Sequence, residues 1–368
     1  MTIAPNSARS LDMMDGPPNT LDSIADVADA AVDAPGDMAG YASTGISENS
    51  TDRGRGFAGR PALRIERPSV QKVPIVVASP HSGRDYPLDL GARDDLDGAA
   101  LRSSEDGFID EVFAGAVDIG APLISALFPR VYVDVNRAPR ELDPAMFSEP
   151  LPDGVTTRNA RIAAGLGTIA RVVANAEPIY DRKLSLAEVE ARLQTCYHPY
   201  HSALRELIDQ TREKFGVCLL IDAHSMPSAA VASGRSRSRA GTNGQDQNQH
   251  GHQNRHQGKG NGIDMVLGDC HGVACHPLVM GHVEAAMVQL GYRVRRNNPY
   301  AGGFVTRHYG QPAQGVHALQ IEINRGLYMD EERIERRPKL PDLAADMRKV
   351  LSVLAEVAPS LSLTAQAD

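Results

Sequence analysis

Short apolar runs alternate with segments of helical periodicity along the middle of the chain. The runs that predict strands are VPIVVAS (73–79), VYVDV (131–135), VCLLIDA (217–223), DMVLGD (264–269) and ALQIEI (318–323). Apolar residues at helical spacing predict helices over 185–193, 201–215, 277–290 and 330–357, with Pro338 and Pro341 interrupting the last. This alternation is typical of α/β proteins, so we expect a mixed, mostly parallel central sheet flanked by helices.

Two segments lack this pattern. Residues 1–65 are rich in Ala, Asp, Gly, Ser and Pro, and 228–262 contains the tract GQDQNQHGHQNRHQGKGNG. Neither has enough large apolar residues to offset the entropy of ordering. We therefore expect a disordered leader at 1–65, a single α/β domain at 66–358 with a disordered insertion at 228–262, and a flexible tail at 359–368.

The insertion carries three histidines, His250, His252 and His256. They could hold a metal loosely, but no cysteine or carboxylate cluster accompanies them to fix a coordination geometry. A solvated polar loop is the favoured interpretation.

Composition excludes several classes of protein. The net charge of -8, an aromatic share of 5% and the absence of Trp disfavour a nucleic-acid platform. The N-terminus lacks the basic start and apolar core of a secretory signal, and no run approaches the roughly 20 apolar residues of a membrane span. The four cysteines are too few and too scattered for a disulfide scaffold. We expect a cytoplasmic protein that binds neither nucleic acid nor membrane.

Unusual polar clusters follow the predicted strands. PHSGRDYP follows the first strand, NRAPRELDP the second, HSMPS the third, CHG the fourth and NRG the last. Ligands of open α/β sheets bind outside the carboxyl ends of the strands. These clusters are therefore expected to converge on one crevice.

The candidate metal ligands in that crevice are His81 and His224, each just past a predicted buried strand. A carboxylate is expected to complete the set, because two histidines, one carboxylate and an open water position are the usual catalytic zinc arrangement. The segment SSEDGFIDEVF, at the start of a predicted helix, offers Glu105, Asp106, Asp110 and Glu111. For His81 alone, a structural hydrogen-bonding role is the alternative.

Glu322 lies inside the apolar run ALQIEINR. An ionised carboxylate is costly there unless it faces a polar cavity. Burial would raise its pKa toward the operating pH, which suits a general acid/base. The alternative is a buried ion pair with Arg325 or Arg137.

Two arginines are predicted to bind an anion. Arg137, preceded by Asn136, and Arg307, followed by His308, lie in loops beside the strand ends. The planar guanidinium binds carboxylate in a bidentate manner, so the two together favour an acidic substrate. A structural salt bridge is the alternative for each.

Other catalytic motifs are weak or missing. Cys270-His271 and Cys275-His276 form a CHxxxCH spacing that matches no zinc ribbon or finger, and we interpret it as structural. A Cys270 nucleophile with a histidine base remains an alternative. The chain contains neither GxSxG nor GxxxxGK[ST], which argues against a serine hydrolase and an NTPase.

With these residues laid out, the chain resembles the N-formylglutamate amidohydrolase family over about residues 70–335. The resemblance rests, in the family's order, on PHSGRDYP, VYVDVNRAPRELDP, YHPYHSAL, LLIDAHSMPS, LGDCHG and GGFVTRHYGQPAQGVHALQIEINRGLYMDE. That family is similar in layout to the zinc carboxypeptidases and aspartoacylases, whose phosphorylase/hydrolase-like α/β sheet binds one zinc at its carboxyl edge. The resemblance implies that His81 and His224 are zinc ligands and that Glu322 is the general acid/base.

The resemblance also implies roles for the remaining candidates. Asp106 is the implied third ligand, because a similar family aspartate precedes a second one by the four residues that separate Asp106 from Asp110. Asn136 and Arg137 look like the carboxylate-binding pair of the carboxypeptidases. Arg307 and His308 would stand near the second end of the substrate.

The implied reaction is zinc-dependent hydrolysis of the formyl amide of N-formyl-L-glutamate, a small acidic N-acyl amino acid, to formate and L-glutamate in histidine breakdown. Two alternatives remain open. One is a deacylase of another N-acyl acidic amino acid, and the other is a catalytically silent module that binds an anion. The insertion after HSMPS could act as a lid.

Overall fold

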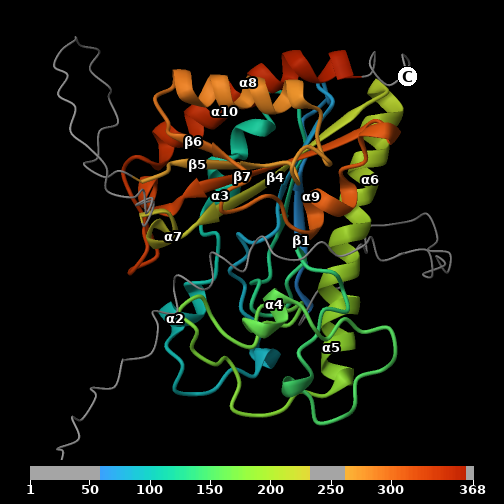
Figure 1. The fold of residues 1–368 in the computed structure, drawn as a ribbon, viewed down its shortest axis with the longest axis vertical. Helices are drawn as coiled ribbons and strands as arrows, with labels where there is room; N and C mark the ends of the chain where they lie inside the picture. The colour runs from blue at the N-terminus through green and yellow to red at the C-terminus, as the bar shows by residue number, and fades with distance from the viewer. Residues whose placement is uncertain (1–58, 233–261, 362–368) are drawn as a thin grey trace, which may run out of the picture.

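The computed structural model describes residues 59–232 and 262–361. One seven-stranded sheet, ordered β1-β3-β2-β4-β7-β5-β6, forms the centre of the molecule (Figure 1). Its strands are β1 (Leu63–Glu66), β2 (Ile75–Ser79), β3 (Leu123–Ala126), β4 (Cys218–Met226), β5 (Met265–Gly268), β6 (Val294–Arg296) and β7 (Val316–Asn324). The β3-β2-β4-β7 neighbours are parallel, as are β5 and β6, whereas β1 is antiparallel to β3 and β5 to β7. The predicted mixed, mostly parallel sheet is confirmed.

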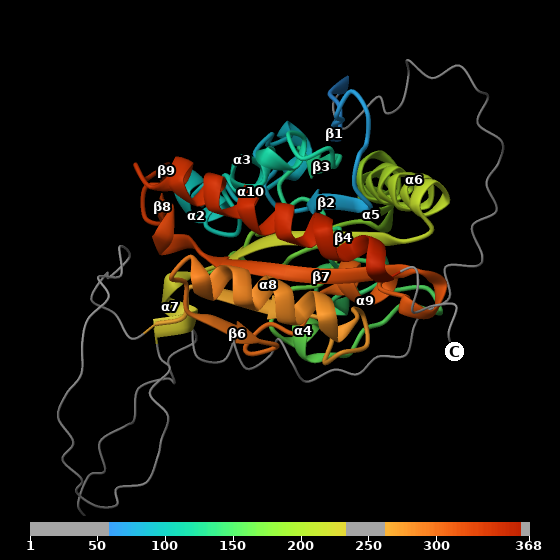
Figure 2. The same cartoon turned by 90° about the horizontal axis from the view of Figure 1, so that it is seen from above.

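Helices cover both faces of this sheet. The helices of the described residues are α2 (Gly98–Arg102), α3 (Ile109–Val112), α4 (Ala160–Ala163), α5 (Leu186–Arg192), α6 (His198–Phe215), α7 (Ser228–Ala232), α8 (Pro277–Gln289), α9 (Phe304–Tyr309) and α10 (Leu340–Val357). Short 3₁₀ turns lie at Leu88–Leu90, Ala114–Ala116, Pro144–Met146, Pro312–Gln314, Arg325–Leu327 and Ala358–Ser360. Core residues of α3, α8 and α10 pack on one face, and those of α6 and α9 pack on the other (Figure 2).

The alternation of side chains along β4 shows how the sheet positions polar groups. Leu219 and Ile221 point to the face covered by α8 and α10, whereas Leu220 points to the face covered by α6. Because successive side chains point to opposite faces, Asp222 and His224 continue the row of Leu220. The α6 face of the strand thus changes from apolar to polar as the strand approaches its carboxyl end.

The predicted strand at 131–135 is wrong. The position beside β2 is occupied by β3, which comes just before this run in the chain. The run is buried, but its backbone bonds to loops and helices: the Asp134 amide donates to the Thr168 carbonyl at 2.8 Å, and Arg192 Nη1 donates to the Tyr132 carbonyl at 3.1 Å. A short buried apolar run can be satisfied in this way without joining a sheet, so its composition alone does not specify a strand.

The last predicted helix begins later than expected. Helix α10 starts at Leu340 with Pro341 in its first turn, where a missing amide hydrogen is tolerated. The preceding residues form a two-stranded ribbon, β8 (Met329–Asp330) with β9 (Glu335–Arg336). Upstream, a π-helical segment, Leu193–Tyr197, joins α5 to α6, so the predicted helices at 185–193 and 201–215 belong to one continuous stretch.

Ordered elements extend into all three segments that were expected to lack them. Strand β1 begins within 1–65, α7 lies within 228–262, and a 3₁₀ turn that begins at Ala358 continues into the tail, where Leu361 is buried. Residues 1–58, 233–261 and 362–368, including His250, His252 and His256, lie outside the described residues. Across 59–232 and 262–361, none of the helices has the length and apolarity that crossing a membrane requires.

Candidate active site

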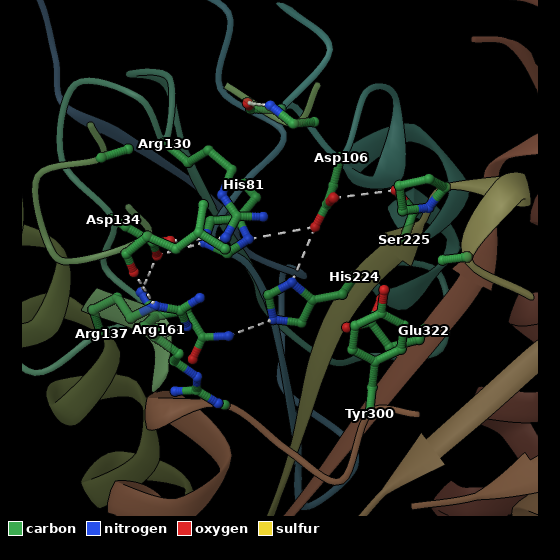
Figure 3. Close-up of a pocket in the computed structure, with 18 of the residues that line it drawn as sticks. His81, Asp106, Arg130, Asp134, Arg137, Arg161, His224, Ser225, Tyr300 and Glu322 are labelled. Carbon is green, nitrogen blue, oxygen red and sulfur yellow. Dashed lines mark hydrogen bonds and ion pairs between the residues drawn. The ribbon is translucent and has the colours of Figure 1, made fainter. Parts of the chain in front are cut away.

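A cavity of about 210 Å³ lies at the carboxyl ends of β2, β4 and β7 (Figure 3). Its lining includes His81 just after β2, His224 on β4 and Glu322 on β7. The cavity is on the sheet face that α6 and α9 cover. It is where ligands of open α/β sheets are expected.

The parallel pairing of β4 with β7 brings four polar side chains together. Asp222 lies opposite Gln320, and His224 lies opposite Glu322. Residues two apart on a strand point to the same face, so all four share the α6 face of the sheet. β4 extends through Met226, so His224 lies within the strand rather than just past its end as predicted.

Three predicted ligands meet in this cavity. His81, Asp106 and His224 are all buried, and one nitrogen or oxygen of each lies within 4.8 Å of the others. Asp106 Oδ2 is 3.0 Å from His224 Nδ1 and 3.4 Å from His81 Nδ1. These three side chains could hold a metal ion.

The tautomer of His81 follows from its other contact. Its Nε2 lies 2.7 Å from Asp134 Oδ1, and because a carboxylate accepts, Nε2 carries the hydrogen. In the neutral ring the Nδ1 lone pair then faces Asp106. This buried Nδ1 has no hydrogen-bond partner within the described chain. Two electron-rich atoms facing each other across a buried gap are the arrangement that a cation satisfies.

His224 has the same arrangement. Its Nε2 lies 2.9 Å from Asp222 Oδ1, so its Nδ1 also points toward Asp106. Burial would lower the pKa of His224, but the charge of Asp222 and the hydrogen bonds to Asp106 and Asp222 outweigh burial and raise the pKa well above its usual value. The site therefore attracts positive charge, whether a proton on His224 or a cation at the Nδ1 atoms.

Asp106, not Glu105, faces the histidines. Arg325 Nη2 donates to Asp106 Oδ1 at 2.9 Å, which leaves Oδ2 for the histidines, and the Asp106 amide donates to the His81 carbonyl at 3.0 Å. Glu105 turns away and accepts a hydrogen bond from the Tyr86 hydroxyl at 2.8 Å.

The other two carboxylates of this segment point elsewhere as well. Asp110 makes an ion pair with Arg64, and Glu111 makes one with Arg336. Of the four carboxylates in the segment, Asp106 is the one in the ligand group.

Glu322 is buried beside this group and accepts a hydrogen bond from Gln320 Nε2 at 2.9 Å. Burial, reinforced by the negative charges of neighbouring aspartates, outweighs the attraction of His224 and raises the pKa of Glu322 to about 7. Arg325, one partner considered for an ion pair with Glu322, instead pairs with Asp106. A carboxyl that titrates near neutrality can both accept and donate a proton.

Asn136 and Arg137 line the same cavity. Asn136 Nδ2 lies 3.1 Å from His224 Nε2, which places this pair next to the ligand group. Arg137 donates from Nε to the Leu166 carbonyl and from Nη1 to the Asn136 carbonyl, both at 2.9 Å. These bonds fix the guanidinium while leaving its other N–H donors for an anion.

The start of α6 supports the loop that carries this pair. His201 Nε2 donates to the Val135 carbonyl at 2.9 Å, and the Tyr197 hydroxyl, at the end of the π-helical segment, donates to the Arg137 carbonyl at 2.8 Å. Tyr197 and His201 belong to the YHPYHSAL motif. The two hydrogen bonds from that motif therefore fix the loop that carries Asn136 and Arg137.

Arg307 and His308 are not among the residues that line the cavity. His308 Nε2 lies 3.4 Å from Arg205 Nη2, and its ring stacks on Phe304 with centroids 4.9 Å apart. Their role in substrate binding stays a prediction.

The CHG cluster is also absent from the lining. It follows β5, which runs antiparallel to β7 with Gly268 opposite Gln320, and the Cys270 amide donates to the Ala301 carbonyl at 2.7 Å. A Cys270 nucleophile therefore gains no support from this geometry.

Three charged lining residues were missed by sequence reasoning, namely Arg130, Asp134 and Arg161. Asp134 carried a usable signal, since a charged residue inside the apolar run VYVDV raises the same question as Glu322 inside ALQIEI. Arg161 carried no such sequence signal, because the surrounding residues, ARIAAGLG, contain neither a strand end nor a polar cluster.

A protein-family model described as N-formylglutamate amidohydrolase matches residues 73–329. The chain belongs to the N-formylglutamate amidohydrolase family. The match contains every residue of the ligand group, Glu322 and the Asn136–Arg137 pair, so the cavity lies wholly within the family's shared region.

Related family members agree with this assignment. The N-formylglutamate deformylase of Pseudomonas putida is 28% identical over 291 residues, which is 77% of this chain and 92% of that protein. The N-formylglutamate deformylase of Pseudomonas aeruginosa is 29% identical over 268 residues, 71% of this chain and 84% of that protein. The crystal structure of N-formylglutamate amidohydrolase from Ralstonia eutropha JMP134 superposes with a TM-score of 0.69 and 33% identity, covering 82% of this chain and 99% of that one. The chain is thus an amidohydrolase with the fold of this family.

Proposed function

We propose that this amidohydrolase cleaves the formyl amide of N-formyl-L-glutamate to give formate and L-glutamate, using one divalent metal ion held by His81, Asp106 and His224. The observation that carries the proposal is the meeting of two Nδ1 atoms and one carboxylate oxygen beside the buried Glu322. The names of the family relatives support the choice of substrate.

The chemistry of the donor set favours zinc. Two imidazole nitrogens and one carboxylate oxygen are the protein ligands of many catalytic zinc sites, whereas Mg²⁺ and Ca²⁺ prefer oxygen ligands alone. The hydrogen bonds to Asp134 and Asp222 hold the two rings in the tautomer that ligation through Nδ1 requires. When bound there, a zinc ion supplies Lewis-acid activation of water and of the formyl carbonyl.

Glu322 moves the proton. Its carboxylate accepts a proton from the attacking water and then donates it to the nitrogen of the departing glutamate, so that the amide bond breaks with a neutral amine as leaving group. A pKa of about 7 suits both steps, because neither direction of transfer is strongly uphill near neutral pH.

Asn136 and Arg137 position the substrate. Their place beside His224 suits them to bind the carboxylate on the carbon next to the scissile nitrogen. A bidentate guanidinium contact fixes both the position and the direction of the amide, which supplies part of the rate acceleration. We also assign this enzyme to the cytoplasm, on the sequence composition, and to histidine breakdown, on the family resemblance alone.

The experiment is to measure formate release from N-formyl-L-glutamate by the purified protein, before chelation, after chelation and after zinc return. We expect activity to be lost with the chelator and restored by zinc. Full activity in the chelated, metal-free protein would contradict the metal assignment. Turnover of longer N-acyl glutamates with no formate release under any metal would contradict the formyl assignment.

A further inference from the structure

Of the four arginines that line the cavity, Arg325 pairs with Asp106, and the other three lie on one side of it (Figure 3). These three differ in how their charge is balanced. Arg130 Nη2 pairs with Asp134 Oδ2 at 2.8 Å. The hydrogen bonds of the Arg137 side chain go to backbone carbonyls. The Arg161 side chain, carried on α4, has no hydrogen bond or ion pair to any residue of 59–232 or 262–361.

Arg137 and Arg161 repel each other. The positive charge of Arg137, together with burial, lowers the pKa of Arg161 to about 9. Arg161 nevertheless stays protonated at neutral pH. Glu141 attracts both guanidinium groups and offsets only part of this effect. Two cationic groups held together at a partly buried wall are unfavourable unless an anion binds between or beside them.

Arg137 is linked to the ligand group by direct contacts. Its Nη1 donates to the carbonyl of Asn136, whose Nδ2 lies 3.1 Å from His224 Nε2. Arg161 makes no such contact with Asn136 or the ligand group among the described residues, and the charge with the largest effect on it is that of Arg137.

This order matches the order of anionic groups in an N-formyl acidic amino acid. The first carboxylate is on the carbon bonded to the scissile nitrogen, and the second lies farther out at the end of the side chain. With the formyl group at His81, Asp106 and His224, the first carboxylate meets Asn136 and Arg137. The second then extends toward Arg161.

We propose that Arg161 binds the side-chain carboxylate of the substrate and selects acidic over neutral N-formyl amino acids. This assignment rests on the proposed function, which sets the position of the scissile amide. It gives Arg161 the role that the sequence suggested for Arg307, which does not line the cavity.

The test compares three substrates: N-formyl-L-glutamate, N-formyl-L-glutamine, which lacks the side-chain charge, and N-formyl-L-isoglutamine, which lacks the other charge. In Arg161→Gln we expect the ratio of kcat/KM for N-formyl-L-glutamate over N-formyl-L-glutamine to fall about 10- to 100-fold, the range for loss of charge-assisted hydrogen bonds. The preference over N-formyl-L-isoglutamine should persist. Arg161→Lys should recover part of the lost ratio, because it restores the charge without the planar fork.

Arg158→Gln is the matched control. Arg158 precedes α4, is exposed and does not line the cavity, so its replacement removes the same charge from the same segment. We expect its substrate ratios to equal those of the parent protein.

Two results would overturn the assignment. One is an unchanged glutamate-to-glutamine ratio in Arg161→Gln. The other is loss of the preference over N-formyl-L-isoglutamine instead, which would give Arg161 the first carboxylate. Either result leaves the proposed function standing, provided that the parent protein releases formate from N-formyl-L-glutamate. Failure of the parent protein to do so would refute the proposed function separately.

Discussion

Asp134 Oδ1 lies 2.7 Å from His81 Nε2, and this contact determines which nitrogen of His81 faces the cavity. The other oxygen of Asp134 is held by Arg130 Nη2 at 2.8 Å, so the carboxylate cannot easily turn. The charges of Arg130 and Arg137 and the hydrogen bond with His81 outweigh burial and hold the pKa of Asp134 well below its usual range. Asp134 therefore stays ionised and fixes His81 as a ligand through Nδ1.

We predict that Asp134→Asn weakens zinc binding about 10- to 100-fold, the usual effect of removing a carboxylate behind a metal-binding histidine. Competition with a chromophoric chelator measures the affinity directly, without reference to activity. Asp143→Asn is the control, because Asp143 also pairs with an arginine, Arg171, but does not line the cavity. Equal zinc affinity in the two variants would contradict the role assigned to Asp134.

A second prediction separates the two adjacent carboxylates. Asp106→Asn should fail to retain zinc after gel filtration, because the oxygen that faces both histidines loses its charge. Glu105→Gln should retain one zinc per chain, since Glu105 contacts Tyr86 and Arg102 instead. Metal analysis of both proteins, with thermal melting to establish that each is folded, tests the assignment. Zinc loss in Glu105→Gln alone would reverse it.

A third prediction concerns the proton carrier. Glu322→Gln should lower kcat for formate release about 10²- to 10⁴-fold, the range attributed to general acid/base catalysis, while zinc content stays unchanged. Glu335→Gln, at an exposed position on β9, is the control and should match the parent protein.

The pH profile provides a second test of Glu322. A general base acts in its ionised form, so kcat/KM should fall as pH drops through the pKa of Glu322. That pKa is about 7 without a cation, and the positive charge of a bound metal lowers it, so the acid limb should lie on the acid side of neutrality. A parent enzyme whose rate rises steadily toward acid pH would exclude Glu322 as the base.

The fourth prediction concerns acid stability. Burial lowers the pKa of His201 to about 3 from its usual 6.5, so the unfolded chain takes up a proton at a pH where the folded protein does not. The stability that the neutral ring contributes is therefore full above about pH 6.5 and is lost progressively as pH falls toward about 3. Between about pH 7.5 and pH 5 the loss from this one residue is about 2 kcal/mol.

Denaturant unfolding at these two pH values measures the effect. We expect His201→Gln, which keeps a donor for the Val135 carbonyl, to lose about 2 kcal/mol less than the parent protein over this interval. His282→Gln, at an exposed position on α8, is the control and should follow the parent protein. Identical pH dependence in all three proteins would refute the prediction.

The sequence could predict the elements that repeat a strong local pattern. The apolar runs that became β2, β4, β5 and β7 and the amphipathic stretches of α6, α8 and α10 were recognised because burial on one or both faces constrains composition. The ligand group was recognised for a related reason, since His81 and His224 adjoin such runs. The choice of Asp106 over Glu105 needed the resemblance, because both carboxylates stand in the same short segment.

What the sequence could not supply was the direction and contact partners of loops. The run VYVDV meets every local criterion for a strand, yet it is a buried loop, because Thr168, Arg192 and His201 satisfy its backbone from distant parts of the chain. The reversed direction of β5 depends on its antiparallel pairing with β7, which no local pattern in the sequence specifies. Arg161 reaches the cavity from a four-residue helix with no distinctive pattern.

The strand order β4-β7-β5 has a consequence for how the molecule is completed during synthesis. His81, Asp106 and His224 are all present once the chain reaches the end of β4, but β5 and β6 have no link to the rest of the sheet until β7 enters between β4 and β5. Glu322 arrives on that same strand. A chain that stops short of β7 therefore lacks both the strand that joins the two parts of the sheet and the proposed proton carrier.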